Sequence, residues 1–308
     1  MKKRILITGG SGLLGVNWAV TALEEFDVWL GLHQRDIKIH GVKTCFLDMS
    51  SLSSAQRCIQ IFAPEIVVHA AGLTSVELCE KSSEDAKKMN VDLAVNIATA
   101  CAQSNIALAH ISTDHLFSGN HAMQREDDPI SPQNTYASTK ASAESCVSSE
   151  WPKALIVRTN FYGWGPHYRR SFSDYILDSL RAQQEVKLFQ DVHYTPILAE
   201  TLVIAVHDLL RIGASGLFHV VGDERVSKYE FGLRIAKQFN LDKNLLIPVS
   251  ILERKDLVPR PLDMSLSNAK TCQILGRKLG GLGHHLARLA QQEKLGLRDE
   301  LLLGEGRK

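Results

Sequence analysis

A glycine-rich turn between a short apolar run and an amphipathic segment constrains this chain of 308 residues more than any other feature. The apolar run Ile5–Ile7 stops at residues 8–15, TGGSGLLG, and apolar side chains then recur with helical periodicity over residues 12–25. This order predicts a buried strand, a tight turn and a helix that packs back on the strand. Glycine suits such a turn because the absence of a Cβ lets backbone segments approach each other closely.

The same turn resembles those that hold the pyrophosphate of a dinucleotide. Gly9 permits the tight turn, Gly12 lets the backbone approach the pyrophosphate, and Gly15 lets the helix pack close to the sheet. The spacing is GxxGxxG rather than GxGxxG, and an ordinary glycine-rich turn between a strand and a helix is the alternative. The position directly after an N-terminal strand favours cofactor binding, with contacts expected from Gly9, Gly12, Leu13, Leu14 and Gly15.

Strands and helices alternate along the first half of the chain, which predicts an α/β fold with a Rossmann-type doubly wound parallel sheet. We place a dinucleotide-binding domain at residues 1–160. Residues 161–308 are expected to form mainly a smaller C-terminal α/β substrate-binding region, with some segments returning to the main sheet; no fold is predicted after about Gly276. The predicted strands after the first are residues 27–32, 45–49, 65–72, 107–112, 155–158 and 216–221, and the predicted helices include residues 51–62, 89–103, 172–182, 199–210 and 228–239.

The end of the second predicted strand indicates which dinucleotide binds. A site specific for NAD usually has a carboxylate at this strand end to hold the ribose 2′-hydroxyl. In this chain Asp36 lies a little beyond that position. His33 and Arg35 stand at this strand end instead, where cations would neutralise the 2′-phosphate of NADP. We therefore favour NADP as the cofactor, with NAD and an ordinary basic loop as the alternatives. Further residues expected beside the cofactor follow the third and fourth predicted strands: Asp48, Met49, Ala70, Ala71 and Gly72.

Tyr136 and Lys140 stand four residues apart in the sequence YASTK. On a helix, for which Asn134 is a suitable first cap, they share one face and can meet the same ligand. A neighbouring ammonium favours the phenolate, so we expect Lys140 to lower the pKa of Tyr136. Thr113, at the end of the preceding predicted strand, supplies a second hydrogen-bond donor. These three groups are suited to protonate a carbonyl oxygen while hydride reaches its carbon, and the alternative is a surface aromatic beside a solvated lysine.

Composition limits the other classes of function. With 35 basic and 34 acidic residues and no dense basic run, little favours nucleic-acid binding. No apolar stretch approaches the roughly 18–20 residues that a bilayer requires, so no membrane association is expected. The six cysteines contain no CxxC pair and the twelve histidines show no ligand spacing. We therefore expect reduced thiols, no metal site and a cytoplasmic location.

Four motifs in this order resemble the extended short-chain dehydrogenase/reductases: TGGSGLLG at residues 8–15, HAAG at 69–72, STD at 112–114 and YASTK at 136–140. Within that family the chain is most similar to the dTDP-4-dehydrorhamnose reductase branch, over roughly residues 1–275. Two departures concern the substrate end of the site. The family more often has STDYVF where this chain has His115-Leu116-Phe117, and it commonly has Trp where Phe161 stands.

The resemblance implies hydride transfer from NAD(P)H to a ketone, with Tyr136 as the proton donor. Lys140 would also hydrogen bond the nicotinamide ribose, and Thr113 would hold the carbonyl oxygen. Each position expected to meet the substrate also has a plain structural explanation, as a helix cap, a core residue or a surface ion pair. These substrate positions are Thr74, Val76, Asp114, Phe161 and Arg260.

The leading hypothesis is a reductase of a nucleotide-linked 4-keto-6-deoxy sugar, an activity that serves polysaccharide biosynthesis. A first alternative is an NAD-dependent sugar-nucleotide epimerase or dehydratase, although a dehydratase commonly has Asp-Glu after the catalytic Thr and here Asp114 precedes His115. A second alternative is a non-catalytic NADP-binding regulatory subunit like that of methionine adenosyltransferase, which resembles the same branch. The oligomeric state stays open, with a homodimer as one form.

Overall fold

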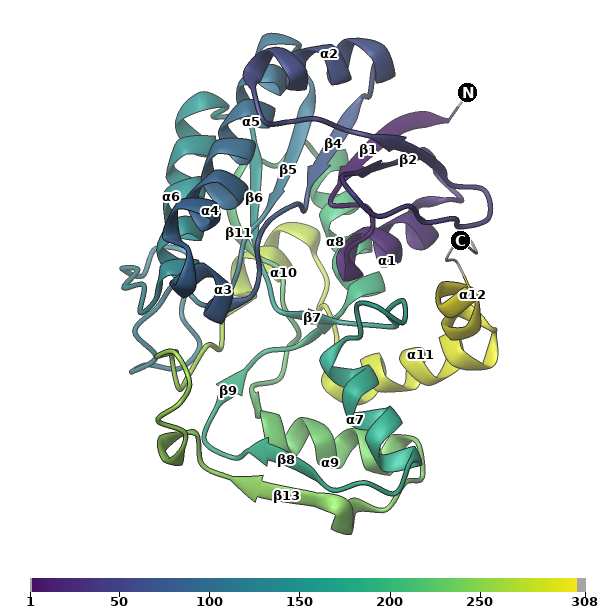
Figure 1. Cartoon of the computed structure of the whole chain (residues 1–308), viewed down its shortest axis with the longest axis vertical. Coiled ribbons are helices and arrows are strands. Elements are labelled where there is room, and N and C mark those ends of the chain that lie inside the picture. The colour runs from purple at the N-terminus through teal and green to yellow at the C-terminus, as the bar shows by residue number, and fades with distance from the viewer. Residues whose placement is uncertain (1, 304–308) are drawn as a thin grey trace.

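The computed structural model describes residues 2–303, and a parallel sheet lies at the centre of the molecule (Figure 1). Its strands among these residues are β1 (Lys3–Thr8), β2 (Phe26–Leu32), β3 (Lys43–Phe46), β4 (Ile66–His69), β5 (Ala107–Ile111), β6 (Leu155–Arg158) and β11 (Gly216–His219). They lie in the order β11-β6-β5-β4-β1-β2-β3, and all neighbouring pairs are parallel. The predicted α/β fold with a doubly wound parallel sheet is confirmed. The order reverses between β1 and β4, and open α/β sheets bind ligands at the carboxyl ends of the strands beside such a point.

Helices cover both faces of this sheet (Figure 1). One face carries α2 (Leu52–Phe62), α5 (Leu93–Gln103) and α6 (Thr135–Glu150), and the other carries α1 (Leu13–Ala22) and α8 (Ala199–Arg211). Alternate side chains of a strand face the two layers, so Leu6 of β1 packs in the core under the first group of helices, and Ile5 and Ile7 pack under the second. Burial on both faces is the reason that these strands are almost continuously apolar.

The C-terminal half forms short strand pairs and helices beside the carboxyl ends of the sheet (Figure 1). Its elements are β7 (Phe161–Tyr162), α7 (Phe172–Arg181), β8 (Val186–Phe189), β9 (His193–Tyr194), β10 (Ile197–Leu198), β12 (Val226–Ser227), α9 (Lys228–Gln238), η2 (Lys243–Leu245), β13 (Leu246–Val249), η3 (Ile251–Glu253), α10 (Ala269–Leu275), α11 (Leu282–Lys294) and α12 (Leu297–Leu303). β7 pairs with β10 and β8 with β13 in parallel, whereas β9 pairs with β12 antiparallel. Between these elements the chain returns to the main sheet, where β11 pairs with β6 as its edge strand.

The structure differs from the sequence-based predictions at several bounds. The third strand is Lys43–Phe46 rather than residues 45–49, so Asp48 and Met49 lie in the loop after it. Two short helices that the sequence did not predict, α3 (Val76–Lys81) and α4 (Ser83–Lys87), follow β4. The helix predicted from residue 89 begins instead with a π-helical turn, η1 (Lys88–Asp92). The segment after Gly276, for which the sequence predicts no fold, supplies α11 and α12.

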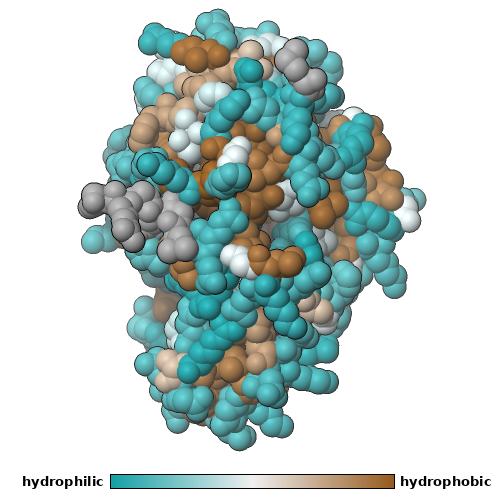
Figure 2. Space-filling view, turned by 90° about the vertical axis from the view of Figure 1, so that its right-hand side faces the viewer, coloured by the Kyte–Doolittle hydropathy of each residue, from teal (hydrophilic) through white to brown (hydrophobic). Residues whose placement is uncertain are grey.

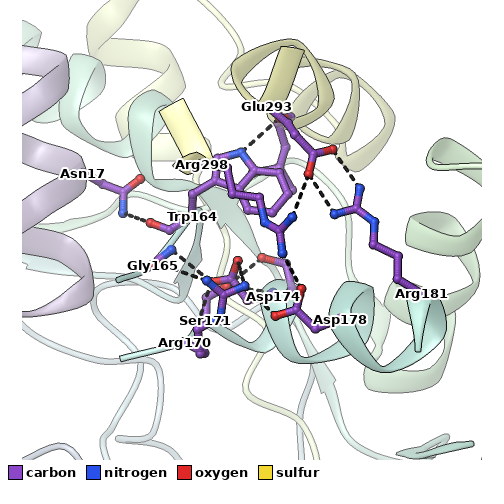
Figure 3. A network of polar contacts seen from close by, with 12 residues as sticks. Asn17, Trp164, Gly165, Arg170, Ser171, Asp174, Asp178, Arg181, Glu293 and Arg298 are labelled. Carbon is purple, nitrogen blue, oxygen red and sulfur yellow. Dashed lines mark hydrogen bonds and ion pairs between the residues drawn. The ribbon is translucent and has the colours of Figure 1, made fainter. Parts of the chain in front are cut away.

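A polar network fastens the C-terminal helices to the rest of the chain (Figure 3). Asn17 of α1 donates a hydrogen bond to the carbonyl of Trp164 (2.8 Å). The fully buried Trp164 indole donates in turn to the carbonyl of Leu289 in α11 (3.1 Å). Arg298 of α12 forms an ion pair with Asp178 of α7. The network thus joins the helix that follows the glycine-rich turn to the C-terminal half of the chain.

Hydrophilic and hydrophobic side chains alternate over the face shown in Figure 2. The exposed large apolar side chains lie on several elements, for example Phe46 in β3, Ile61 in α2 and Leu295 after α11. Their scatter identifies no interface between subunits, and the homodimer stays a prediction. Among residues 2–303 there is no helix with the length and apolar character needed to cross a membrane.

Candidate active site

The turn after β1 lies so close to other backbone segments that its glycines have no room for a side chain. Gly9 has a φ of +70°, and a Cβ there would lie 2.8 Å from the backbone nitrogen of Ala71. A Cβ on Gly15 would lie 2.6 Å from the carbonyl oxygen of Gly9. That same oxygen accepts a hydrogen bond from the nitrogen of Gly12 (2.8 Å). The predicted tight turn and close packing of the helix are therefore present.

α1 starts at this turn without a side-chain cap. Its N-cap is Gly12, and no acidic residue lies in its first turn. The first N–H groups of a helix have no intrahelical acceptors and carry the positive end of the helix dipole. The Leu14 side chain is buried in the core, so this position offers a ligand its backbone alone, and the Leu13 carbonyl accepts a hydrogen bond from Asn17 (2.8 Å). An uncapped helix terminus beside a side-chain-free turn fits a pyrophosphate group.

Small residues at the end of β4 form the other side of this expected pyrophosphate site. The nitrogen of Ala71 donates a hydrogen bond to the Thr8 hydroxyl (3.3 Å), and the Ala70 carbonyl oxygen would lie 2.9 Å from a Cβ on Gly9. A Cβ on Gly72 would lie 2.8 Å from the side-chain oxygen of Asn90. The protein's own backbone contacts thus require small residues here, and these residues leave backbone rather than side chains facing the turn.

The residues predicted to select the cofactor lie after β2 and β3. His33 and Arg35 are exposed, and the Arg35 guanidinium lies over the Tyr168 ring, 3.9 Å from its centroid. Hydrogen bonds from Ser50 and Ser54 hold the pKa of Asp48 below its usual value, and the charge of His33 acts in the same direction. The carbonyl of Met49 accepts a hydrogen bond from α5 (3.0 Å). His33 and Arg35 therefore lie exposed after β2, and the Asp48 carboxylate lies within electrostatic range of His33.

α6 brings Tyr136 and Lys140 to the carboxyl end of β5. The Asn134 side chain caps this helix by accepting a hydrogen bond from its backbone (2.9 Å), and it also donates to the carbonyl of Pro259 (2.9 Å). Tyr136 and Lys140 are buried, with 9% and 7% of their surfaces exposed. The Lys140 ammonium donates a hydrogen bond to the carbonyl of Ile111, the last residue of β5 (2.7 Å). The predicted cap and the shared helix face are therefore present.

The prediction that Lys140 lowers the pKa of Tyr136 is wrong for the protein chain by itself. Burial raises the pKa of Tyr136 to about 12, and a hydrogen bond with the Thr113 side chain acts in the opposite direction. Desolvation of the phenolate is the larger effect because the phenol lies inside the protein. Burial also lowers the pKa of Lys140 to about 8, against the charge of Glu144 one helical turn away. At neutral pH the phenol thus keeps its proton, which is the state that a proton donor needs.

Thr113 lies in a small hydrogen-bond network beside Tyr136. Its hydroxyl donates to Asp114 (3.3 Å) and accepts from the backbone nitrogen of His115 (3.3 Å). The Asp114 carboxylate, only 1% exposed, also accepts a hydrogen bond from Asn160 of the C-terminal half (2.5 Å). The His115 ring contacts the Tyr136 ring edge-on, with centroids 5.6 Å apart. The three predicted catalytic side chains are therefore together at one strand end.

Two predicted substrate residues follow β4. The Thr74 hydroxyl accepts a hydrogen bond from Arg169 of the C-terminal half (2.6 Å). Val76, the first residue of α3, is buried in one apolar cluster with Tyr136. Val76 thus lies beside the predicted proton donor, and Thr74 lies where the two halves of the chain meet.

The other predicted substrate residues come from the C-terminal half. Phe161 lies in β7 and is half-buried. Arg260 forms an ion pair with Glu77 of α3 and donates to the carbonyl of Val258 (3.2 Å). Burial lowers the pKa of His115, and the charges of Lys228 and Arg260 act in the same direction, against the charge of Asp114. Arg260 therefore belongs to the surroundings of the catalytic strand end, with its guanidinium already paired.

Sequence reasoning missed Asn90, which connects three segments at the site. Asn90 lies in η1, donates to the Thr139 hydroxyl (3.0 Å) and the Leu73 carbonyl (3.1 Å), and accepts from the Leu73 nitrogen (2.7 Å). It thereby holds the loop after β4 against α6. Isolated π-helical turns occur frequently at functional sites, but apolar periodicity carries no signal for them.

Sequence reasoning predicts a loop after β7 but missed the contacts that Tyr168 and Arg169 of this loop make at the site. Tyr168 donates a hydrogen bond to the carbonyl of Ser11 in the glycine-rich turn (2.9 Å), and Arg169 reaches Thr74. The basic residues of this loop resemble an ordinary surface segment in the sequence. The loop in fact spans from the turn after β1 to the loop after β4.

Residues 2–303 could hold two other kinds of site, a metal site and a cavity. Within residues 2–303, no group of three or more His, Cys, Asp or Glu side chains is arranged to hold a metal ion. A cavity of about 360 Å³ lies at the amino ends of β1 and β4 and is lined in part by Lys3, Glu65 and His207. None of the predicted site residues lines that cavity, so the chemistry points to the opposite edge of the sheet.

The chain is similar to several proteins along most of its length. It is 27% identical over 274 residues to the Haloferax volcanii protein named "Probable low-salt glycan biosynthesis reductase Agl14", with 86% of this chain and 90% of that protein covered. It is 27% identical over 257 residues to Methionine adenosyltransferase 2 subunit beta of Bos taurus, with 80% and 75% covered. The solved structure of dTDP-4-dehydrorhamnose reductase from Bacillus anthracis in complex with NADP matches with a TM-score of 0.83 at 26% identity, covering 95% of this chain and 100% of that one.

These similarities confirm the predicted resemblance to the extended short-chain dehydrogenase/reductases and to their dTDP-4-dehydrorhamnose reductase branch. The family match begins at the first strand and continues into α11, so it includes both the sheet and the C-terminal half. The chain belongs to the family described as the RmlD substrate binding domain, which matches residues 2–294.

Proposed function

We propose that the protein is an oxidoreductase that uses NADPH to reduce the 4-keto group of a nucleotide-linked 6-deoxy sugar. The observation that carries the proposal is the buried set of Thr113, Tyr136 and Lys140 at the end of β5. These residues lie at the same edge of the sheet as the glycine-rich turn. Relatives named as a glycan biosynthesis reductase and as dTDP-4-dehydrorhamnose reductase support both the redox chemistry and the class of sugar.

In the proposed reaction Tyr136 donates its phenolic proton to the carbonyl oxygen. The glycine-rich turn would hold NADPH, which would supply hydride to the carbonyl carbon. Thr113 holds the carbonyl oxygen by turning its hydroxyl proton from Asp114 toward the substrate. Lys140 would hydrogen bond the ribose next to the nicotinamide through an N–H that Ile111 does not take, and so would hold the cofactor beside Tyr136. Burial of all three side chains excludes water and strengthens these interactions.

NADPH is preferred over NADH in this proposal because of the residues after β2. The basic side chains of His33 and Arg35 suit a 2′-phosphate, whereas an NAD-specific site would have a carboxylate at the end of β2. The NADP in the solved Bacillus anthracis relative supports the same choice. NADH is the alternative cofactor.

The substrate side of the site is assigned to the C-terminal half and the loops that face it. We propose that residues 1–160 bind the dinucleotide and that residues 161–308 mainly bind the substrate. An Arg260 that binds the diphosphate must exchange its partner Glu77 for phosphate oxygens, which the fork of a guanidinium suits. The sugar would contact the remaining predicted positions, namely Thr74, Val76, Asp114 and Phe161.

A non-catalytic role is the second candidate, favoured by the 27% identity to Methionine adenosyltransferase 2 subunit beta. A regulatory subunit of this kind would bind NADP without turnover and form a stable complex with a partner enzyme. The epimerase or dehydratase alternative is weaker, because His115 stands where a dehydratase commonly has Glu. The cytoplasmic location and the homodimer stay predictions.

The test is oxidation of NADPH by the purified protein in the presence of dTDP-4-keto-6-deoxy sugars. The proposal expects one equivalent of NADPH to be consumed for each keto group reduced, with the alcohol identified by mass spectrometry. Absence of turnover with every nucleotide-linked keto sugar would overturn the proposal. NADP binding without turnover, together with a stable complex with methionine adenosyltransferase, would favour the regulatory role.

A further inference from the structure

Lys228 stands where the fold gives no reason for a cation. It is the first residue of α9, directly after the N-cap Ser227, whose capping box with Glu230 already closes the start of this helix. A positive charge in the first turn opposes the helix dipole. The Lys228 side chain is half-buried, and within the described residues its ammonium makes no ion pair or hydrogen bond. A cation kept in such a position needs another explanation.

Aromatic rings hold the Lys228 ammonium in place. It lies 3.3 Å from the centroid of the Tyr194 ring and 5.0 Å from that of Phe172. The pairing of β9 with β12 sets Tyr194 opposite Val226, two residues before the lysine. Such cation–π contacts position an ammonium but leave its N–H groups available as hydrogen-bond donors.

A chain of contacts leads from this ammonium toward the catalytic strand end: the rings of Tyr194 and Tyr162 both pack against Phe231, and Tyr162 lies two residues after the Asn160 that binds Asp114. The charge of Asp114 acts on Lys228 against the effect of burial, which lowers the pKa of Lys228 to about 8. The charge of Lys228 contributes in turn to the lowered pKa of His115. The Tyr194 hydroxyl is buried without a hydrogen-bond partner among the described residues. Burial raises the pKa of Tyr194, and the charge of Asp114 acts in the same direction. A cationic donor and a hydroxyl thus interact electrostatically with Asp114, the anionic acceptor that binds Thr113.

A sugar hydroxyl matches this combination of groups, because it donates one hydrogen bond and accepts others. An anionic diphosphate matches less well, since the Asp114 carboxylate would repel it. If Thr113 holds the carbonyl oxygen, the group that meets the adjacent Asp114 lies on a carbon next to the ketone. In a 4-keto-6-deoxy hexose that neighbouring hydroxyl is on C3, because C5 carries the methyl group and the ring oxygen.

We propose that Lys228, with Asp114 and Tyr194, forms a subsite that binds the 3-hydroxyl of the sugar and makes the enzyme specific for substrates that carry it. This inference rests on the proposed function. Lys228 is then a specificity-determining residue, because its hydrogen bond acts on the substrate and not on the reacting atoms.

The test compares Lys228→Met with Lys237→Met, a change at an exposed lysine of the same helix. Each protein is assayed with dTDP-4-keto-6-deoxyglucose and with its 3-deoxy counterpart. Loss of a charge-assisted hydrogen bond lowers kcat/KM for the first substrate roughly 10- to 100-fold in Lys228→Met. The 3-deoxy substrate is expected to react equally with both variants. An equal loss on both substrates, or no loss on either, would overturn the subsite.

A second measurement avoids turnover. Calorimetric titration with dTDP-glucose, which has a 3-hydroxyl but no ketone, should show weaker binding to Lys228→Met, whereas dTDP alone should bind both variants as it binds the wild type. Unchanged NADPH affinity shows that the variant is folded, and Lys228→Gln replaces Lys228→Met in the same comparison if it is not. Absence of wild-type turnover with these two sugars and with every other nucleotide-linked keto sugar contradicts the proposed function. Wild-type turnover with a Lys228→Met variant that behaves like Lys237→Met contradicts the subsite alone.

Discussion

The ammonium of Lys140 donates a hydrogen bond of 2.7 Å to the carbonyl oxygen of Ile111, the last residue of β5. This bond fixes the lysine at the strand end that carries the candidate site. Burial lowers the pKa of Lys140 to about 8, although the charge of Glu144 in the same helix acts in the opposite direction. The neighbouring His69 and His110 are buried, and burial lowers the pKa of each far enough that both are neutral. Lys140 is therefore the charged member of this buried group at neutral pH.

The charge of Lys140 predicts how the reaction depends on pH. The side chain is protonated below its pKa of about 8 and neutral above it, so Lys140 loses its charge and one of the N–H donors that would hold the nicotinamide ribose as the pH rises. We expect kcat/KM for reduction to fall as the pH rises through about 8. Lys140→Met should be slow at every pH and lack this decline, whereas Lys228→Met should keep it. A wild-type profile that stays level above this pH contradicts the role of Lys140.

Gly15 is expected to tolerate no side chain. An added Cβ would lie 2.6 Å from the carbonyl oxygen of Gly9, so Gly15→Ala must displace the turn. The affinity for NADPH, measured by fluorescence titration, should fall by about tenfold or more, in line with the cost of overpacking. Gly283 in α11 is the matched control, because a Cβ there has no neighbour within 4 Å. Gly283→Ala should leave NADPH binding unchanged and stabilise the helix by about 0.5–1 kcal/mol. Equal NADPH affinity in both variants would show that the turn does not hold the cofactor.

Arg35 tests the choice of cofactor. Arg35→Ala should weaken NADPH binding by roughly 10- to 100-fold, since a charge-assisted contact with the 2′-phosphate is lost. NADH, which has no 2′-phosphate, should bind the variant as it binds the wild type. Lys38→Ala, at an exposed position three residues further on, is the control and should change neither affinity. A parallel loss of both affinities in Arg35→Ala would argue against a 2′-phosphate contact.

His207 is expected to make the fold sensitive to acid. Its Nε2 accepts a hydrogen bond from the Trp18 indole (2.9 Å), and burial lowers its pKa to about 4. An unfolded histidine has a pKa of about 6.5, so the unfolded chain takes up the proton first as the pH falls. The stability contributed by neutral His207 is complete above about pH 6.5 and is lost as the pH falls toward about 4.

Denaturant unfolding across this range of pH checks that prediction. His207→Gln keeps a hydrogen-bond acceptor but cannot titrate, so the slope of unfolding free energy against pH should decrease by up to about 1.4 kcal/mol per pH unit. His284→Gln, at an exposed position of α11, should leave the slope unchanged. Identical slopes in the two variants would mean that His207 does not carry the effect.

The parts of the fold that could be predicted from sequence are those set by local periodicity. The order of strand, glycine-rich turn and helix over residues 5–22, the cap at Asn134, and the shared face of Tyr136 and Lys140 all follow from side chains close in the chain. These features depend on helix and strand geometry and on the missing Cβ of glycine. They do not depend on which distant segment packs nearby.

The rest depends on contacts between residues far apart in the sequence. The raised pKa of Tyr136 comes from burial, which no local pattern reports. Arg169 meets Thr74 across 95 residues, and Asn160 meets Asp114 across 46. Such pairs form only when the C-terminal half packs against the carboxyl ends of the strands. The sequence therefore indicates the reaction better than it indicates the residues that surround the substrate.

Replacement of the phenol at Tyr136 tests the central claim most directly. Tyr136→Phe removes the proton donor and keeps the ring that packs with Val76. The variant, the wild type and Tyr175→Phe, an exposed control in α7, are compared for NADPH oxidation with a dTDP-4-keto-6-deoxy sugar. Loss of a general acid should lower kcat by roughly 10²- to 10⁴-fold in Tyr136→Phe while NADPH affinity and the Tyr175→Phe rate stay at wild-type values. Wild-type turnover by Tyr136→Phe would contradict the account.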